Sequence, residues 1–218
     1  MIDKDKYKTL LDYSEKEIEI KKSRFIGYAK QCETEEDALA FIEEINKLHR
    51  QATHNCYAYA NGVRRNTQRY SDDGEPQGTA GIPILEVIKK EDLTNVAIVV
   101  TRYFGGVKLG ASGLIRAYTA AAVEAIEAGT IIWKKNFYKM SLEIDYTLLG
   151  KIDNLIANEG FFELDRDYTD KVKIYFYIHL EKKDYFIETM TENTNGQGII
   201  EVLDEVLLSE RKGQIIGG

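Results

Sequence analysis

A glycine-rich segment at residues 105–110 has the composition of an anion-binding loop. It follows an expected buried strand and precedes an expected helix, so backbone N–H groups and the positive end of the helix dipole would face one ligand. The residues that would form the site are Gly105, Gly106, Lys108, Gly110 and Ser112. The segment is not a Walker A motif, because Ala111 stands where that motif has lysine. A turn that lets the helix pack tightly on the sheet explains the glycines equally well.

Three carboxylates lie within four residues, at Asp72, Asp73 and Glu75. Oxygen ligands of this kind suit Mg²⁺, and carboxylates that differ in burial can act as acid and base. The Asp-Gly and Glu-Pro steps in the same segment are typical of a solvated turn, and the spacing is not that of an EF-hand. We therefore favour a turn or a partner-contact loop, and predict no metal.

Arginines alternate with aromatic residues in the first half of the chain. The interleaved residues are Arg64, Arg65, Arg69, Arg102, Lys108 and Arg116, with Tyr57, Tyr59, Tyr70, Tyr103 and Phe104. Guanidinium groups beside aromatic faces suit single-stranded RNA or phosphate. We favour binding for Arg64, Arg65 and Arg69, which we expect to be exposed. For Arg102 and Arg116 we favour a structural role, in ion pairs with the nearby carboxylates.

His54 and Cys56 share one face of an expected strand and could be mistaken for a catalytic or metal-binding pair. Zinc needs three or four ligands, and the other thiol and imidazoles have no supporting spacing. Packing is the better explanation. The sequence thus predicts no catalytic residue and no cofactor.

Composition limits the class of protein. The chain has 218 residues, of which 44% are hydrophobic and 30% charged, and it has only two cysteines. Its first residues are charged, and no apolar run approaches the roughly 20 residues that span a bilayer. We expect a cytoplasmic protein with no membrane partner.

The net charge of −7 is unevenly distributed. Residues 1–135 hold 20 basic and 20 acidic residues, whereas residues 136–218 hold 9 and 16. An acidic second half argues against a general nucleic-acid coat, because neutralising phosphates needs clustered cations. Any RNA contact should lie on the first half, and DNA specificity is not evident.

Hydrophobic periodicity in residues 136–218 alternates between the strand and helix patterns. The expected elements are a strand at 137–146, a helix at 148–158, strands at 161–167 and 172–180, a helix at 183–193 and a strand at 199–207. The order βαββαβ predicts a ferredoxin-like domain. Gly160 is the expected C-terminal cap of the first helix.

Residues 1–135 form the other expected domain, with residues 134–136 as the linker. A strand or hairpin arm at 18–31 precedes a helix that Thr34 and Asp37 would cap, with Ala38, Phe41, Ile42, Ile45 and Leu48 as its core stripe. The remaining expected elements are a strand at 53–60, an extended loop at 63–82, a helix at 83–91, a strand at 95–104 and a helix at 113–128 capped by Ser112.

Five motifs occur in order over most of residues 18–130. They are Thr53–Tyr59, Ser71–Pro76, Gly78–Gly81, Thr101–Gly110 and Leu114–Tyr118. Together they resemble the IMPACT family, and the second half resembles the extra domain of its bacterial, YigZ-type branch. The resemblance implies an α+β protein of two domains: an N-terminal α/β sandwich like domain IV of elongation factor G and the GHMP kinases, and a C-terminal ferredoxin-like domain like domain V of that factor.

The resemblance also implies a role in translation. Eukaryotic relatives restrain the general-control stress kinase by competing for its ribosome-associated activator. They do so with an RWD domain in addition, which this sequence lacks, so the same partner is not implied. Our leading hypothesis is a non-catalytic binding protein that contacts RNA, the ribosome or a translation-associated protein. The alternative is a small phosphate- or nucleotide-binding enzyme that uses residues 105–112 and the carboxylates of residues 72–75.

Overall fold

A computed structural model describes residues 6–216 of the chain, which form two compact units. Of the described residues, unit 1 comprises 6–134 and 209–214, and unit 2 comprises 135–208 and 215–216. The structure is α+β, as the sequence predicts. In the part of the chain that the structure describes, no helix has the length and apolar character to cross a membrane.

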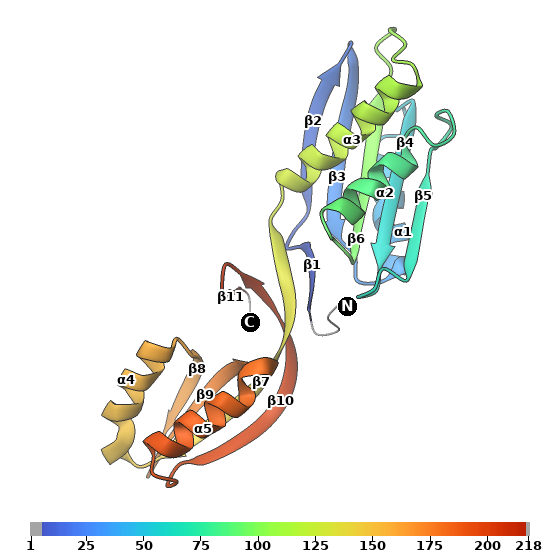
Figure 1. The fold of residues 1–218 in the computed structure, drawn as a ribbon. Coiled ribbons are helices and arrows are strands. Elements are labelled where there is room, and N and C mark those ends of the chain that lie inside the picture. Colours follow the sequence, from blue (N-terminus) through green and yellow to red (C-terminus); the bar gives the residue numbers. More distant parts are fainter. Residues whose placement is uncertain (1–5, 217–218) are drawn as a thin grey trace. The chain divides into compact units, whose positions relative to one another are not determined.

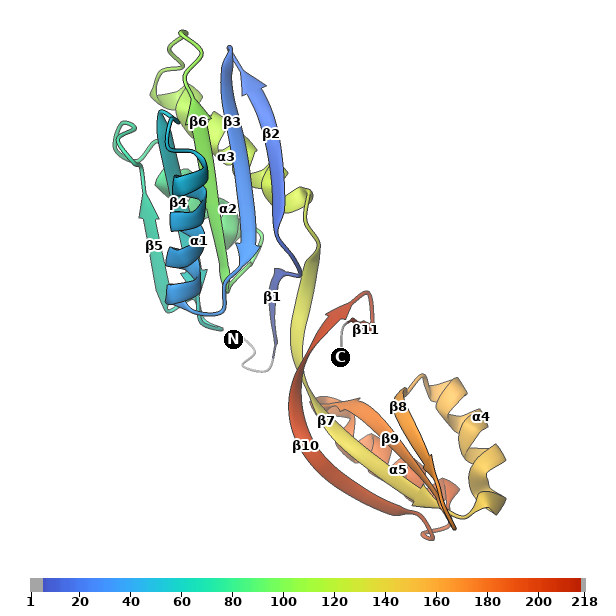
Figure 2. The same ribbon diagram turned by 180° about the vertical axis from the view of Figure 1, so that it is seen from behind.

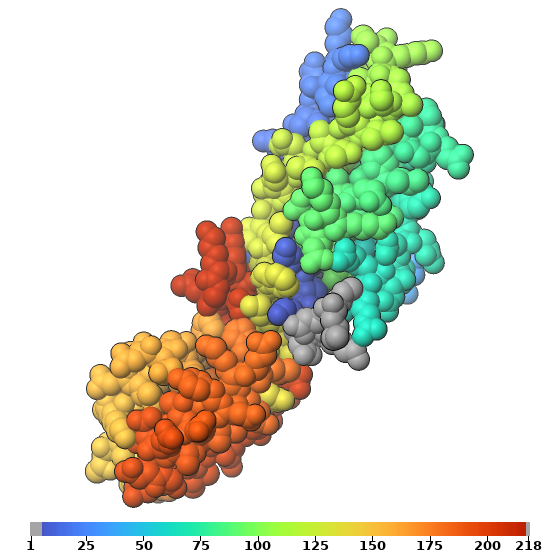
Figure 3. All heavy atoms as spheres, viewed as in Figure 1, coloured from blue at the N-terminus to red at the C-terminus, as the bar shows by residue number. Residues whose placement is uncertain are grey.

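Unit 1 is built on a five-stranded antiparallel sheet in the order β2-β3-β6-β4-β5. The strands are β2 (Ser14–Ile20), β3 (Ser23–Gln31), β4 (His54–Asn61), β5 (Thr67–Ser71) and β6 (Val96–Tyr103). Helix α1 (Glu35–Leu48) covers one face, and α2 (Gly81–Lys90) and α3 (Ala111–Glu127) cover the other (Figures 1 and 2). Figure 3 shows the side chains of α2 and α3, in green and yellow-green, covering this face of the unit 1 sheet.

The central strand β6 is buried on both faces, which explains its continuous apolar run. Val96, Ile98 and Val100 join the cluster under α2 and α3, whereas Ala97 and Val99 join the cluster under α1. The two cysteines are divided in the same way. Cys56 is buried in the α2/α3 cluster and Cys32 in the α1 cluster.

Helix α1 begins as predicted. The Asp37 N–H donates to Thr34 Oγ1 at 3.1 Å, and the Thr34 N–H donates to the Asp37 carboxylate at 3.0 Å, which completes a capping box. Four of the five predicted stripe residues are buried, but Leu48 is 66% exposed. It is the last residue of the helix, directly before the C-cap residue His49.

Helix α3 packs unusually close to β3. A Cβ on Gly27 would lie 2.3 Å from the carbonyl oxygen of Ala121, so only glycine fits on the strand. Alanines on the facing side of α3 are fully buried, at positions 117, 121 and 125. Small side chains on both elements therefore permit this approach.

Two local predictions are wrong. The region expected as one loop contains β5, which pairs with β4 through Tyr59 and Arg69. Ser112 does not cap α3: the helix begins at Ala111, two residues before the predicted start, and Gly110 occupies the N-cap position with φ 73° and no side-chain hydrogen bond. The expected linker at 134–136 lies inside β7 (Ile131–Ile144), and the two units divide there, between residues 134 and 135.

Unit 2 has the ferredoxin-like topology, with strands in the order β10-β7-β9-β8. Its elements are β7, α4 (Leu149–Glu159), β8 (Phe162–Tyr168), β9 (Val172–His179), α5 (Lys183–Asn193) and β10 (Ile199–Arg211). Short elements complete the described chain: β1 (Lys6–Leu10), β11 (Gln214–Ile216) and two 3-10 turns at Tyr146–Leu148 and Leu180–Lys182. Gly160 ends α4 in the left-handed conformation, as predicted. The core is one cluster that includes Ile152, Phe176 and Phe186.

Candidate functional site

A cavity of about 390 Å³ opens at one end of the unit 1 sheet, where β4 begins and β6 ends. The loop before α2 and the loop before α3 close its sides. Its lining residues are Thr53, His54, Glu75, Pro76, Arg102, Phe104, Lys108, Leu109, Gly110, Ala111 and Leu114. The carboxylate segment at 72–75 and the glycine-rich segment at 105–110, which the sequence singled out, therefore meet at one site.

A buried ion pair forms part of the cavity wall. Arg102 Nη1 donates to Glu75 Oε1 at 2.6 Å, and both side chains are more than nine-tenths buried. The Tyr118 hydroxyl, from α3, donates to the same carboxylate oxygen at 2.8 Å. Burial and the neighbouring Cys56 and Glu75 raise the pKa of Tyr118, so it remains a hydrogen-bond donor. This network ties the loop, the sheet and the helix together.

The guanidinium of Arg102 is only partly satisfied. Its Nη2 donates to Ser23 Oγ at a long 3.4 Å, and its Nε has no hydrogen-bond partner among the residues that the structure describes. The rings of Phe25 and Phe104 each lie 5.4 Å from the guanidinium carbon. A buried donor without an acceptor is costly, so this guanidinium is held at some cost in stability.

The other two carboxylates hold the loop in place. Asp72 accepts hydrogen bonds from the N–H groups of Gly78, Ala80 and Gly81 at 2.8–3.0 Å, and so caps the start of α2. Asp73 accepts from the Asn55 N–H at 2.6 Å. Because backbone amides engage these oxygens, the carboxylates act as structural anchors in this structure. Within residues 6–216, no group of three or more metal-ligating side chains is assembled.

His54 and Cys56 are also held by the loop. His54 Nδ1 lies 2.7 Å from the Asp73 carbonyl oxygen, so it carries the proton and donates, and Nε2 lies 3.9 Å from Glu75 Oε1. Cys56 Sγ donates to the Asp72 carbonyl oxygen at 3.0 Å. Burial raises the pKa of this thiol, which makes it a poor nucleophile. The pair packs as expected and forms no dyad.

The loop before α3 rests on the turn between β2 and β3. A Cβ on Gly105 would lie 1.9 Å from the Lys22 carbonyl oxygen, so glycine is needed there for contact. Gly106 and Gly110 have φ values of 83° and 73°, which favour glycine. The turn carries Lys21 and Lys22 to the same end of the sheet as the loop. Sequence reasoning missed both lysines, because only the folded chain brings residue 22 beside residue 105.

Exposed cations and apolar side chains gather at this end of unit 1. We call this set the tip surface; it consists of Lys21, Lys22, Phe104, Val107, Lys108, Ile115 and Arg116. Residues 104–116 contain no aspartate or glutamate. Arg116 Nε donates to the Ser112 carbonyl oxygen of its own helix at 3.3 Å. Among the described residues it is not paired with a carboxylate, which the sequence had suggested. Ser112 itself is exposed.

The arginines favoured for RNA binding lie elsewhere. Residue 54 of β4 pairs with residue 102 and residue 60 with residue 96, so Arg64 and Arg65, which follow β4, lie at the opposite end of the sheet, on the order of 20 Å away. Arg65 forms an ion pair with Asp92 and is largely buried, so its expected exposure is wrong. Arg69 on β5 is exposed, with Glu35 at 4.0 Å.

Tyr103 also faces away from the cavity. Its hydroxyl lies 2.8 Å from His49 Nδ1, and the Arg24 guanidinium lies over its ring, on the α1 side of the sheet. Of the predicted binding residues, the cavity therefore gathers Glu75, Arg102, Lys108 and Gly110.

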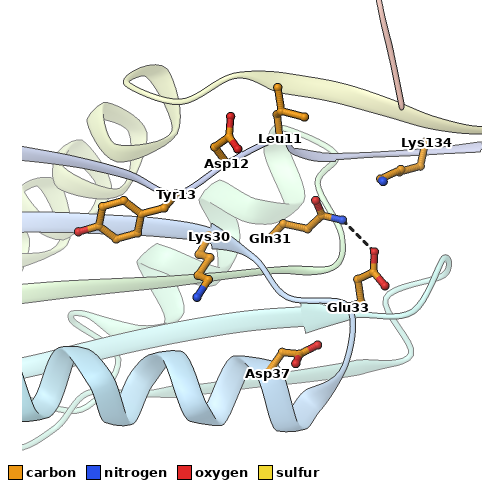
Figure 4. Close-up of a pocket in the computed structure, with 8 residues that line it drawn as sticks. All are labelled: Leu11, Asp12, Tyr13, Lys30, Gln31, Glu33, Asp37 and Lys134. Carbon is orange, nitrogen blue, oxygen red and sulfur yellow. Dashed lines mark hydrogen bonds between the residues drawn. The ribbon is translucent and has the colours of Figure 1, made fainter. Parts of the chain in front are cut away.

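A second cavity in unit 1, of about 410 Å³, carries mixed charges (Figure 4). Lys30 and Lys134 face it together with Asp12, Glu33 and Asp37. Gln31 Nε2 donates to Glu33 at 3.2 Å across part of it. With acids and bases interspersed, this cavity selects no ligand charge.

Comparison with protein families places two domains on the chain. Residues 21–126 match the Impact N-terminal domain, and this range contains the cavity and the whole tip surface, with Lys21 as its first residue. Residues 142–197 match a domain described as Domain of unknown function (DUF1949), within unit 2.

Several relatives match over most of their length. The IMPACT family member YvyE of Bacillus subtilis (strain 168) is 44% identical over 194 residues, which cover 89% of each chain. An IMPACT family member of Haemophilus influenzae is 34% identical over 86% of this chain and 92% of its own. A solved structure described as that of a hypothetical protein matches with a TM-score of 0.59 and 28% identity, covering 92% of this chain and 98% of the other.

Proposed function

Since the chain belongs to the IMPACT family, we propose that it is a non-catalytic, translation-linked binding protein that contacts single-stranded RNA through the tip surface. The observation that carries the proposal is the tip surface itself. It joins four exposed cations to the exposed aromatic ring of Phe104 without an acid in residues 104–116. Cations beside an exposed ring suit a phosphate backbone with unstacked bases.

The charge of the whole chain supports this placement. Residues 136–218 carry seven more acidic than basic residues, which repel phosphate, whereas residues 1–135 are neutral overall. A local cationic surface on a neutral unit therefore offers RNA one favourable point of approach. Of the carboxylates of the 72–75 segment, Glu75 is offset by Arg102, and Asp72 is directed at the backbone amides before α2.

Ribosome co-sedimentation from cell lysate at low and moderate salt tests the proposal. We expect the wild type to co-sediment and a Lys22→Ala/Arg116→Ala variant to lose most of this association, because two phosphate contacts are removed. Arg64→Ala/Arg69→Ala is the matched control: it loses the same charge from surfaces away from the tip, and should co-sediment like the wild type. Equal losses in the two variants, or no co-sedimentation of the wild type, would contradict the proposal.

Titration with single-stranded RNA separates RNA from a protein partner. Four phosphate contacts predict that log K falls with log salt at a slope of about −3. A flat salt response with every RNA, combined with tip-dependent co-sedimentation, would instead identify a ribosomal or translation-associated protein as the partner.

A further inference from the structure

We infer that the cavity beside Arg102 binds a nucleoside monophosphate group, either as a free nucleotide or at the end of an RNA chain. This inference goes beyond the proposed function, because it needs a small-ligand site and no contact with the ribosome.

The first support is the start of α3. Helix α3 spans Ala111–Glu127, and its first turn has neither a side-chain cap nor an acidic residue. The other helices over this sheet are different: Thr34 and Asp37 cap α1, and Asp72 caps α2. The open N–H groups and the positive dipole end of α3 line the cavity at Gly110 and Ala111.

The second, independent support is Arg102. It is 5% exposed, lines the cavity, and retains one guanidinium N–H without an acceptor in the described chain. Arginine is well suited to phosphate because its donors form a planar fork. The Nε itself is covered, so a phosphate oxygen that accepts from it requires a shift of the Arg102 side chain.

The sign of the charge in the cavity follows from its lining. Glu75 and Arg102 offset each other at 2.6 Å, and Tyr118 donates a further hydrogen bond to the carboxylate. Lys108 and the α3 dipole then remain, and both are positive. The cavity therefore selects an anion in spite of the buried carboxylate.

The size and lining indicate an organic body attached to that anion. The volume of about 390 Å³ is many times the roughly 30 Å³ of a water molecule in the liquid. Apolar walls are supplied by Pro76, Phe104, Leu109 and Leu114. A nucleotide whose base packs against the Phe104 ring and whose phosphate lies at the start of α3 would match both the apolar and the positive parts of the lining.

Calorimetric titration of the full chain with adenosine 5′-monophosphate, adenosine and inorganic phosphate tests the inference. We expect the monophosphate to bind at least tenfold more tightly than adenosine. An Ala111→Asp variant should lose at least tenfold in affinity, because its carboxylate occupies the first turn of α3. The same substitution favours the helix dipole, so the melting temperature should not fall. Lys108→Ala removes a positive charge from the lining and should bind the monophosphate more weakly. Lys90→Ala is its control: it removes the same charge from outside the lining and should bind as the wild type does.

Two further titrations identify the source of the phosphate. A 5′-phosphorylated oligonucleotide that binds more tightly than both its 5′-hydroxyl form and the free monophosphate would identify an RNA end. The opposite order would identify a free nucleotide. Equal affinity for the monophosphate and adenosine, or unchanged affinity in Ala111→Asp, would overturn the inference. Neither result bears on ribosome co-sedimentation, so the two proposals fail separately.

Discussion

At the scale of single residues, the Glu75–Arg102 pair is both a support of the fold and a wall of the cavity. Sequence reasoning proposed that Arg102 pairs with one of three nearby carboxylates, and the structure selects Glu75. It could not identify Tyr118 as the second donor, because that contact joins residues 43 positions apart. Buried polar networks of this kind depend on the folded geometry rather than on local sequence pattern.

Replacing Glu75 by glutamine should lower the free energy of unfolding by about 3–5 kcal/mol, because the Arg102 charge is then buried without its counterion. Urea denaturation measures the effect as a shift of the midpoint concentration, with the dependence of the free energy of unfolding on urea unchanged. Glu17→Gln is the matched control. It removes the same charge from an exposed pair with Arg24 and should change stability little. Similar effects of the two substitutions would show that the buried pair is not required.

His49 gives unit 1 a dependence on pH. Its ring nitrogens lie 2.5 Å from the Tyr28 hydroxyl and 2.8 Å from the Tyr103 hydroxyl. Burial, and then the Arg24 charge, lower the pKa of His49 from its ordinary value of 6.5. The unfolded chain therefore takes up a proton at higher pH than the folded chain, so this stabilisation is present above pH 6.5 and is lost as the pH falls through the lowered pKa.

Urea denaturation at several values between about pH 7.5 and 5.5 tests this sign. The free energy of unfolding of the wild type should decrease toward the acidic end. In a His49→Gln variant the decrease should be smaller, although the variant is less stable at every pH. An identical slope in both proteins would assign the pH dependence to other groups.

At the scale of elements, local patterns predicted what local forces determine. The alternation of apolar residues in β9 and their helical spacing in α4 and α5 predicted the topology of unit 2 correctly. The Thr34–Asp37 capping box was predicted from four residues. The errors have non-local causes. Strand β5 is short and polar and owes its conformation to pairing with β4. Gly110 takes the cap position that Ser112 could have filled, because the preceding loop turns through positive φ.

Close packing of α3 on β3 gives a test at this scale. Gly27→Ala should lower the free energy of unfolding by about 1–3 kcal/mol, because the new methyl group meets the Ala121 carbonyl and forces the helix outward. Gly150→Ala, in α4, offers the opposite case. No atom lies within 4 Å of the added Cβ, so helix propensity should make it neutral or stabilising by up to about 1 kcal/mol. Circular dichroism melts compare the two, and equal melting temperatures would refute the packing argument.

At the scale of the whole molecule, charge and chemistry are divided along the chain. The excess of acidic residues predicted that RNA contact belongs to residues 1–135, and the tip surface lies there. What the sequence could not show is which cations share a surface. Arg64 and Arg116 look equivalent in a list of basic residues. Yet Arg64 follows the end of β4 that is far from the cavity, whereas Arg116 lies in the part of α3 that lines it.

The two cysteines lie on opposite faces of the unit 1 sheet, so the rate at which each thiol is labelled measures local opening of the face that covers it. Each thiol is at most 1% exposed, and burial is the main reason that its pKa is raised, so neither reacts readily with an alkylating reagent in the closed structure. The chain contains no other thiol. The labelling rate at Cys56 therefore reports how often α2 and α3 separate from the sheet, and the labelling rate at Cys32 reports how often α1 separates from it. A ligand that binds against α3 should slow the labelling of Cys56 and leave the labelling rate of Cys32 unchanged.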